Sequence, residues 1–458
     1  MNDPHLSPQD DSSGAASSEP HQPADIPGGL PAISGLPSTS PIEPLAREAS
    51  KVGPYAALLT ANYRRFVSGW FLSTLSLQMM AAALQWEIYE RTGSAFALGL
   101  VGLCQALPVL AFALPAGHMA DLRDRKKILL VAQSATVMVA AGLTFASFFD
   151  APVITLYVLV VCAAIAKAFG APARGSMFPL IVHPDIFQNA VTWNSAFFHF
   201  AATVGPILGG AILVWSGAAW PIYLLTSIGT AVFVFTLLGV KPRPQQIDSG
   251  EHSLESMWSG ARYLWREKSI FAALTLDLMA VLFGGATALL PVYAKDILHV
   301  GPIGFGVLRA APYVGAVVMA LVIAHLPPFK RAGRSLLLSV AAFGLAMIAF
   351  GLSRSFALSL VCLLSAGAVD NISVVIRHVL VQTRTPDALR GRVSAVNTVF
   401  IESSNELGSF ESGAVAALFG PVVSVVSGGI GTIVVVLLIA WRWPALARLK
   451  QLRDINEP

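Results

Sequence analysis

The sequence is poor in charged residues. Of its 458 residues only 12% are Asp, Glu, Lys or Arg, about half of the roughly 25% that soluble domains carry. Hydrophobic residues make up 55% of the chain, and the mean hydropathy is +0.66. So little charge cannot cover the water-exposed surface of a soluble protein of this length. The composition therefore predicts an integral membrane protein.

Cysteine is scarce as well, and the recognised catalytic and metal-binding patterns are absent from the sequence. Cys104, Cys162 and Cys362 all fall inside apolar runs, which excludes a disulfide framework and metal-ligand spacing. The nine His residues are scattered. No phosphate-binding Gly-Lys-Ser/Thr loop and no nucleophile motif occurs, which argues against an ATP-driven pump or a membrane enzyme. We expect no metal, no cofactor and no enzymatic activity.

The net charge of +4 does not indicate a nucleic-acid partner. The basic residues occur in short clusters between apolar runs, where they act as signals of membrane topology. Nearly all clusters fall on the side that carries Asp121, and only Arg91, Lys295 and Arg354 are expected on the other side. Because cytoplasmic loops are enriched in Lys and Arg, we expect both termini in the cytoplasm and a multi-pass protein of the plasma (inner) membrane.

Twelve segments meet the requirement of about 20 mainly apolar residues for a membrane-spanning helix. They are residues 66–88, 97–118, 128–149, 152–173, 190–215, 219–239, 270–294, 303–326, 335–353, 356–380, 393–418 and 421–443. The sequence therefore predicts an all-α integral membrane protein with twelve transmembrane helices.

Internal repetition divides these helices into two pseudo-symmetric bundles. Five features of the first half recur 202 or 203 residues later in the second. Those of the first half are Arg174, Pro184-Asp185, Asn194, Gly205 and Gly210, and their counterparts are Arg377, Pro386-Asp387, Asn397, Gly408 and Gly413. Two homologous halves around a central site are a recurrent transporter architecture. The predicted organisation begins with a disordered cytoplasmic tail (1–55) and a six-helix bundle (56–240). A cytoplasmic linker (241–269), a second six-helix bundle (270–443) and a cytoplasmic tail (444–458) follow.

The segment Gly117 to Lys127 concentrates charge between two apolar runs. Its spacing Gly-x-x-x-Asp-x-x-x-Arg-Lys resembles the loop 2–3 signature of the major facilitator superfamily, although Leu122 replaces the usual Arg and Asp124 the usual Gly. The resemblance implies a cytoplasmic latch made by Gly117, Asp121 and Arg125, which holds helix 2 against helix 11 in the outward-open state. The alternative is a plain topology anchor.

Other strings resemble the exporters of this superfamily. Gly205-Pro206-Ile207-Leu208-Gly209-Gly210 is similar to a motif of drug–proton antiporters, with Ala201 in place of its upstream Gly. Pro206 can kink the helix, and Gly205, Gly209 and Gly210 permit close helix contact; a generic packing face is the alternative. Strings beginning at Trp86 and at Leu276 resemble the branch that includes the enterobactin exporters.

Charged residues within spans are functional candidates, because burying them is costly. In the family fold, helices 1, 4, 7 and 10 line a central cavity, which makes Lys167, Asp277, Asp370 and Arg377 cavity candidates. Glu402 and Glu406 lie one turn apart on helix 11, so they repel one another and can share a proton. We expect the coupling proton at Glu402, Glu406, Asp277 or Asp370. Alternatively, each carboxylate only neutralises a helix cation such as Arg309.

These features together predict a secondary transporter, expected to export a small amphipathic molecule, such as a siderophore-like compound or a drug, by proton-coupled alternating access. Its partners are the small-molecule substrate, protons and the bilayer, and we expect a monomer. An importer of a small solute, or a non-transporting receptor or scaffold, remains the alternative.

Overall fold

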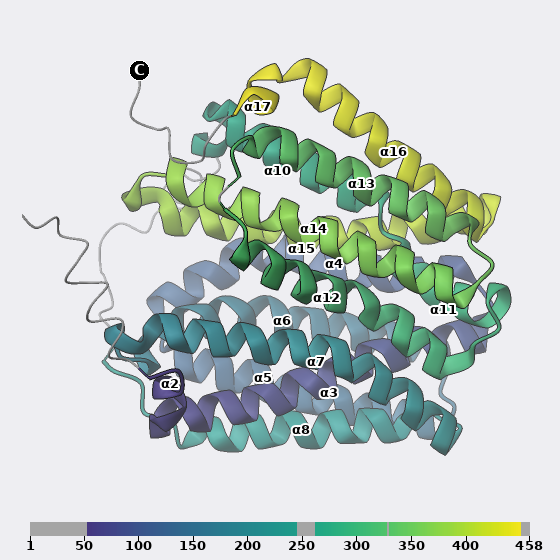
Figure 1. Cartoon of the computed structure of the whole chain (residues 1–458). Coiled ribbons are helices and arrows are strands. Elements are labelled where there is room, and N and C mark those ends of the chain that lie inside the picture. Colours follow the sequence, from purple (N-terminus) through teal and green to yellow (C-terminus); the bar gives the residue numbers. More distant parts are fainter. Residues whose placement is uncertain (1–52, 245–261, 328, 450–458) are drawn as a thin grey trace, which may run out of the picture. The chain divides into compact units, whose positions relative to one another are not determined.

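A computed structural model describes residues 53–244, 262–327 and 329–449 (Figure 1). Almost all of the predicted tail 1–55, most of the predicted linker 241–269 and the last nine residues lie outside these ranges. The described chain is helical, as the composition predicts, and no strand occurs in these ranges.

The first helix set follows the first half of the repeat. After the short α2 (Ala56–Leu59), its long helices are α3 (Ala61–Thr92), α4 (Ala95–Leu122), α5 (Arg125–Phe148), α6 (Val153–Ile181), α7 (Phe187–Ser216) and α8 (Trp220–Leu238). Local sequence sets several of their ends. Gly93 and Gly217 adopt positive φ of 59° and 67° just after α3 and α7, a conformation that glycine adopts without steric cost. Asp124 caps α5 by accepting bonds from the backbone N–H groups of Lys126 and Lys127, which is typical of an N-cap.

The second helix set comprises α10 (Lys268–Phe283), α12 (Gly301–His325), α13 (Ala332–Leu352), α14 (Phe356–Arg384), α15 (Asp387–Phe419), α16 (Pro421–Arg442) and the short α17 (Pro444–Arg448). The predicted span over 270–294 is confirmed as part of the span Lys268–Ile297, but its helix is not regular. After α10 the chain breaks at Gly284 and Gly285 and continues as the short turns η2 (Ala286–Leu289), α11 (Leu290–Val292) and η3 (Tyr293–Ile297). The break brings the backbone against α15: a Cβ on Gly285 would lie 2.6 Å from the carbonyl of Gly408.

All twelve predicted segments form helices, but they differ in polarity. Within the described ranges, eleven helices are long and apolar enough to cross a membrane, and α15 is not among them. Its length of 33 residues suffices, and it packs against α4, α10 and α16. Glu402, Glu406 and Glu411, together with several Ser and Asn residues, make it too polar. A polar helix held among apolar ones marks the part of the bundle where function is expected.

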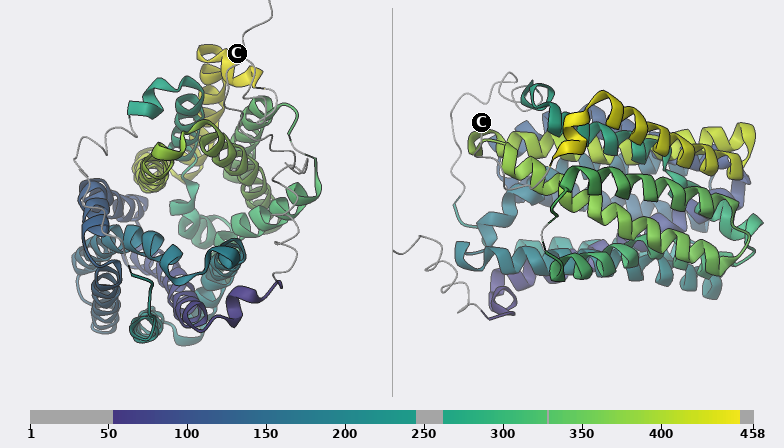
Figure 2. Two further views of the ribbon diagram at one scale, coloured as in Figure 1. Left: turned by 90° about the vertical axis from the view of Figure 1, so that its left-hand side faces the viewer. Right: turned by 45° about the horizontal axis from the view of Figure 1, so that its top comes forward.

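Helices pack mainly within their own set, as the end-on view of Figure 2 illustrates. In the first set α3 contacts α7 and α8, α5 contacts α6 and α8, and α4 contacts α6. In the second set α12 and α13 pack on α14, and α16 packs on α13 and α15. Two extensive contacts join the sets, α4 with α15 and α7 with α12. We call the two ends of the bundle the Asp121 end and the Arg91 end.

Basic side chains cap helix carboxyl ends at the Asp121 end. Arg125 donates to the carbonyl of Ser176 near the end of α6, at 3.1 Å. Lys126 donates to the carbonyls of Leu238 and Val240 at the end of α8, at 3.0 and 2.7 Å. The last four carbonyls of a helix lack intrahelical partners and carry partial negative charge, which applies to Leu238, whereas Ser176 lies five residues before the end of α6. The cations therefore hold the ends of α5, α6 and α8 together.

Candidate functional site

The predicted glycine motif of α7 lies at a contact between the two helix sets. A Cβ on Gly210 would lie 2.3 Å from the carbonyl oxygen of Pro302 in α12, and a Cβ on Gly306 would lie 2.3 Å from the carbonyl oxygen of Pro206. Each helix thus places a glycine against a proline carbonyl of the other helix, and in both helices the glycine follows the proline by four residues. Such close backbone contact requires glycine.

The other two glycines of the motif serve a different contact. A Cβ on Gly205 would meet Gln78 at 2.7 Å, and one on Gly209 would meet the carbonyl of Met79 at 3.2 Å. Both partners belong to α3, so Gly205 and Gly209 pack inside the first set. The motif therefore joins α7 to its own set on one face and to the second set on the other.

The contact between α4 and α15 is the pseudo-symmetric counterpart of the α7–α12 contact. Gly413, which follows Gly210 by 203 residues, faces Gly99, and a Cβ on Gly413 would lie 2.5 Å from the Gly99 Cα. A Cβ on Gly102 would lie 2.5 Å from the carbonyl of Glu406. Two glycine-based crossings thus hold the sets together on opposite sides of the bundle.

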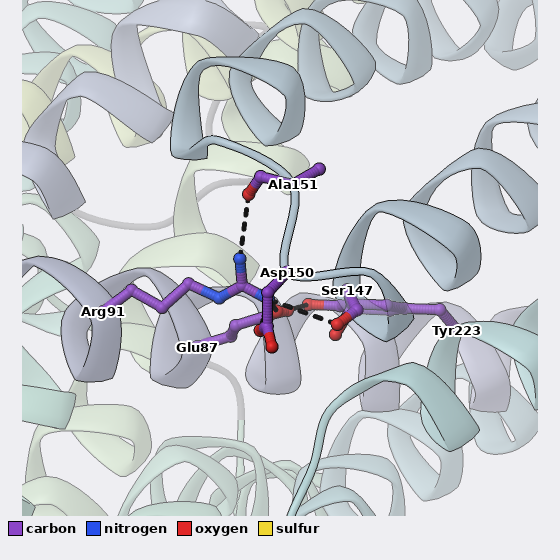
Figure 3. A network of polar contacts seen from close by, with 6 residues as sticks. All are labelled: Glu87, Arg91, Ser147, Asp150, Ala151 and Tyr223. Carbon is purple, nitrogen blue, oxygen red and sulfur yellow. Dashed lines mark hydrogen bonds and ion pairs between the residues drawn. The ribbon is translucent and has the colours of Figure 1, made fainter.

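A polar network fixes the Arg91 end of the first set (Figure 3). Arg91 pairs with Glu87 at 2.5 Å and Asp150 at 3.2 Å, and it donates to the carbonyl of Ala151 at 3.0 Å. From the opposite side Tyr223 donates to Glu87 at 2.5 Å. Glu87 is 6% exposed, so these bonds offset the cost of burying its charge. They tie α3, α8 and the loop between α5 and α6 into one unit.

This fixed end of α3 reaches the second set. Tyr89 donates a hydrogen bond to Asp296 in η3, and the Lys295 ammonium lies 5.9 Å from the centre of the Tyr89 ring. One turn earlier, the Trp86 ring packs 5.7 Å from that of Phe305 in α12. With the two glycine crossings, these contacts close the sets against one another at the Arg91 end.

A cross-set ion pair lies at the middle of the helices. The ammonium of Lys167, the central residue of α6, lies 3.1 Å from the carboxylate of Glu402, which is next to the centre of α15. The Lys167 side chain is 50% exposed and that of Glu402 32%. A half-exposed lysine at mid-span is tolerated only where it faces water or protein rather than hydrocarbon. Lys167 therefore faces a polar space between the two sets.

Glu406 extends this charge cluster toward the Arg91 end. Its carboxylate interacts electrostatically with Lys167, Glu402 and Arg309. Arg309 of α12 also donates to the side-chain oxygen of Gln85 in α3. Helix depth estimated from the sequence at about 1.5 Å per residue predicts that Arg309 pairs with Glu411. This prediction is wrong: Glu411 accepts a bond from Ser412 at 3.4 Å, and the carboxylate that acts on Arg309 is Glu406.

Three of the candidate residues lie together within the second set. Arg377 of α14 forms an ion pair with Asp277 of α10, and each of the two residues is 5% exposed. Asp370, two turns before Arg377 on the same helix, interacts electrostatically with both. Asp277 and Arg377 thus occupy the packed interior between α10 and α14, whereas the resemblance implies that they line the cavity.

The proposed latch residues sit at the Asp121 end of α4 and the start of α5. Arg125 lies 3.9 Å from the half-exposed Asp121 carboxylate, and its Nε donates to the carbonyl of Ala120 at 3.2 Å. Gly117 lies one turn before Asp121 within α4. This arrangement joins α4, α5 and α6 within the first set. The latch to helix 11, here α15, stays a prediction.

The sequence did not indicate several residues that the structure places beside the candidates. Arg174 appeared only as a repeat marker, yet its guanidinium lies 5.3 Å from the centre of the Trp70 ring and interacts with Glu402. Gln85, Tyr89 and Asp296 carried no signal, because polar residues near helix ends are common. Their roles follow from contacts across the two sets.

Comparisons with known proteins identify the family. Residues 52–455 match the family model described as transmembrane secretion effector. The enterobactin exporter EntS of Citrobacter koseri is 27% identical over 382 residues, which cover 83% of this chain and 91% of that protein. The enterobactin exporter EntS of Escherichia coli O1:K1 is 26% identical over the same length and coverage.

Solved structures support the same fold. A bacterial homologue of the human lysosomal transporter Spinster, in an inward-facing and unoccupied conformation, aligns with a TM-score of 0.63 and 14% identity over 85% of this chain and 97% of its own. A POT family transporter in complex with 5-aminolevulinic acid aligns with a TM-score of 0.65 and 13% identity, over 84% and 96%. The chain thus belongs to the transmembrane secretion effector family, an efflux-type branch of the major facilitator superfamily.

Proposed function

We propose that the protein exports a small amphipathic molecule across the inner membrane in exchange for protons, by alternating access between its two helix sets. The observation that carries this proposal is the charge cluster of Lys167, Glu402, Glu406 and Arg309 at the junction of the sets. Its members come from α6, α12 and α15, and therefore from both sets. Relative motion of the sets must rearrange this cluster.

The relatives suggest the substrate class. Both named relatives are enterobactin exporters, which favours a siderophore-like compound. The substrate would enter from the cytoplasm, which we place at the Asp121 end because that end carries most of the basic residues. Contacts between the sets run from the Arg91 end to the middle of the helices, so the described conformation corresponds to one open toward the cytoplasm.

Protonation of Glu402 or Glu406 would change the ion pairing within the cluster. While Glu402 is charged, separating it from Lys167 would leave two uncompensated charges at the middle of the membrane-spanning helices, which is unfavourable. A proton that binds Glu402 or Glu406 from outside, while the sets are separated at the Arg91 end, neutralises this charge, so the empty transporter can close that end again. Release of the proton inside, in the conformation open toward the cytoplasm, restores the pair with Lys167.

The test uses Glu406→Gln in liposomes with an imposed pH gradient. The variant mimics a permanently protonated residue, so uphill export should be lost while downhill exchange of substrate persists, because exchange needs no net protonation cycle. Glu411→Gln, on the same helix but bonded to its neighbour Ser412, is the matched control and should retain uphill export. Uphill export by Glu406→Gln at the wild-type rate would remove this residue from the coupling mechanism.

The same assay separates the other proposals. A proton-coupled importer would accumulate substrate in the opposite direction under the same gradient, and a receptor or scaffold would move none. We propose that the unit is a monomer without enzymatic activity, because both halves of the site come from one chain. A cross-linking experiment at dilute protein in nanodiscs tests this, and a defined dimer would contradict it.

A further inference from the structure

The charges of Asp277, Asp370 and Arg377 in the second set do not cancel. Asp277 and Asp370 supply two carboxylates, and Arg377 supplies one guanidinium that pairs with Asp277. Asp370 interacts electrostatically with both partners. If all three groups were charged, one negative charge would remain uncompensated beside the apolar residues of α10 and α14. Such a charge is very costly, and in practice a group in this position is neutralised.

Unpartnered polar atoms point into the same place. The Nε of Arg377 is buried and has no hydrogen-bond partner among the described residues, and the same holds for the hydroxyl of Ser373, which is 1% exposed. Ser373 follows Asp370 by three residues and precedes Arg377 by four, so the three side chains share one face of α14. A buried donor that lacks a partner costs about 1–3 kcal/mol. This cost indicates that a ligand binds at this face, or that an acceptor side chain can turn toward these donors in a second arrangement.

We propose that Asp277, Arg377 and Asp370 form a second proton-binding site, in which Arg377 neutralises one carboxylate and a bound proton neutralises the other, Asp370. The step is a simple association: the Asp370 carboxylate takes up one proton and becomes a neutral acid. When that proton leaves, the free Nε and the second face of the Arg377 guanidinium are available to Asp370. The site therefore holds either a proton or a shared arginine.

Pseudo-symmetry explains why Asp370 rather than Asp277 exchanges the proton. Asp370 follows Lys167 by 203 residues, the same offset that relates Arg377 to Arg174. Lys167 is the central residue of α6, and Asp370 is the central residue of α14. Lys167 faces the polar space between the sets, and Asp370, unlike the buried Asp277, is partly exposed. Water in that space can deliver a proton to Asp370.

Few other titratable groups face this site. In the middle parts of the helices packed against α14, the titratable groups are Asp277 on α10, Arg309 and Tyr313 on α12, and Glu402, Glu406 and Glu411 on α15; α14 itself adds Arg377 and His378. Lys268 of α10, His325 of α12, Arg334 of α13 and Arg384 of α14 lie at the Asp121 end of these helices. Of these groups, Arg377 acts on Asp370, and Asp370 in turn acts on Asp277. Across the space, the counterpart of Glu402 at the same offset is His199 of α7, whose Nδ1 is buried without a partner among the described residues.

Infrared spectroscopy of the full-length protein in nanodiscs tests the site without any substrate. A protonated carboxyl group has a carbonyl stretch that is separate from that of a carboxylate. At neutral pH we expect one such acid band that persists in Glu406→Gln and is lost in Asp370→Asn. Asp277→Asn should also abolish it, because Arg377 is then released to pair with Asp370 and no proton is required. A monodisperse gel-filtration peak shows that each variant is folded.

Two results would overturn the proposal. Retention of the acid band in Asp370→Asn would place the proton on another group, and its loss on adding sodium chloride at constant pH would assign the site to a sodium ion instead. The inference rests on the proposed function only for the use of the proton in transport. Failure of the Glu406→Gln test leaves the Asp370 band unaffected, and absence of the band leaves the Glu406 test unaffected, so the two failures are distinguishable.

Discussion

Replacing Gly306 by alanine should force the two helix sets apart at the Arg91 end. The added Cβ would lie 2.3 Å from the carbonyl oxygen and 2.9 Å from the carbonyl carbon of Pro206, whereas ordinary contact begins at 3.4 Å. Both contacts are with backbone in the middle of α7, which cannot rotate away as a side chain could. Helices α7 and α12 must therefore separate by about 1 Å, or the protein must adopt a different conformation.

Overpacking of this kind typically costs about 1–3 kcal/mol. Alanine also stabilises a helix interior by about 0.5–1 kcal/mol relative to glycine, but it does so in both conformations. The clash exists only where α7 and α12 meet, so it disfavours the closed Arg91 end alone. The expected shift toward the conformation open at that end is about 5- to 150-fold.

Distance measurements between spin labels report this shift directly. Labels on Glu90→Cys and His299→Cys, which are exposed positions on either side of the Tyr89–Asp296 contact, should give a longer distance in Gly306→Ala than in the wild type. Gly175→Ala in α6 is the matched control, since its Cβ would meet nothing within 4 Å. An unchanged distance distribution and unchanged transport in Gly306→Ala would refute the close-packed crossing as the element that closes this end.

Two further predictions concern the ends of the first set. Arg91→Gln should lower the thermal unfolding temperature, because Glu87 is left buried with one hydrogen bond and no cation, a loss of about 3–5 kcal/mol for a buried pair. Adding Glu87→Gln should restore much of the stability. Equal unfolding temperatures of the single and double variants would contradict the pairing. Asp121→Asn should reduce transport at unchanged expression, since an amide is a weaker partner for Arg125 and for a helix N-terminus; full activity in a vesicle uptake assay would reduce Asp121 to a topology signal.

Much of the fold could be predicted because membranes impose strong rules on sequence. Each span needs a long apolar run, and all twelve predicted segments are helical. The interruption of the helix that begins at Lys268 was not predicted, because Gly284 and Gly285 do not interrupt the apolar run although they interrupt the helix. The structure also extends α6 and α14 well beyond the apolar runs, to Ile181 and Arg384, since helices continue through the interface region where polar residues are tolerated.

The site was less accessible to prediction because pairing depends on rotation about each helix axis. The charged candidates were identified from composition alone, yet their partners were not. Arg309 lies near Glu406 rather than Glu411, a difference of five residues, or more than one helical turn. An estimate of depth from the sequence cannot distinguish these faces, since 1.5 Å per residue fixes height but not direction.

The capping of α6 and α8 by Arg125 and Lys126 has a consequence for the biogenesis of the protein. The sequence predicts that these positive charges orient the nascent chain in the membrane, and the same groups bond helix carbonyls in the folded bundle. The same residues thus contribute both to the predicted orientation of the chain and to the stability of the folded protein. Attempts to invert the topology by removing these charges would also weaken the finished protein, so misoriented chains would be poorly folded and readily cleared.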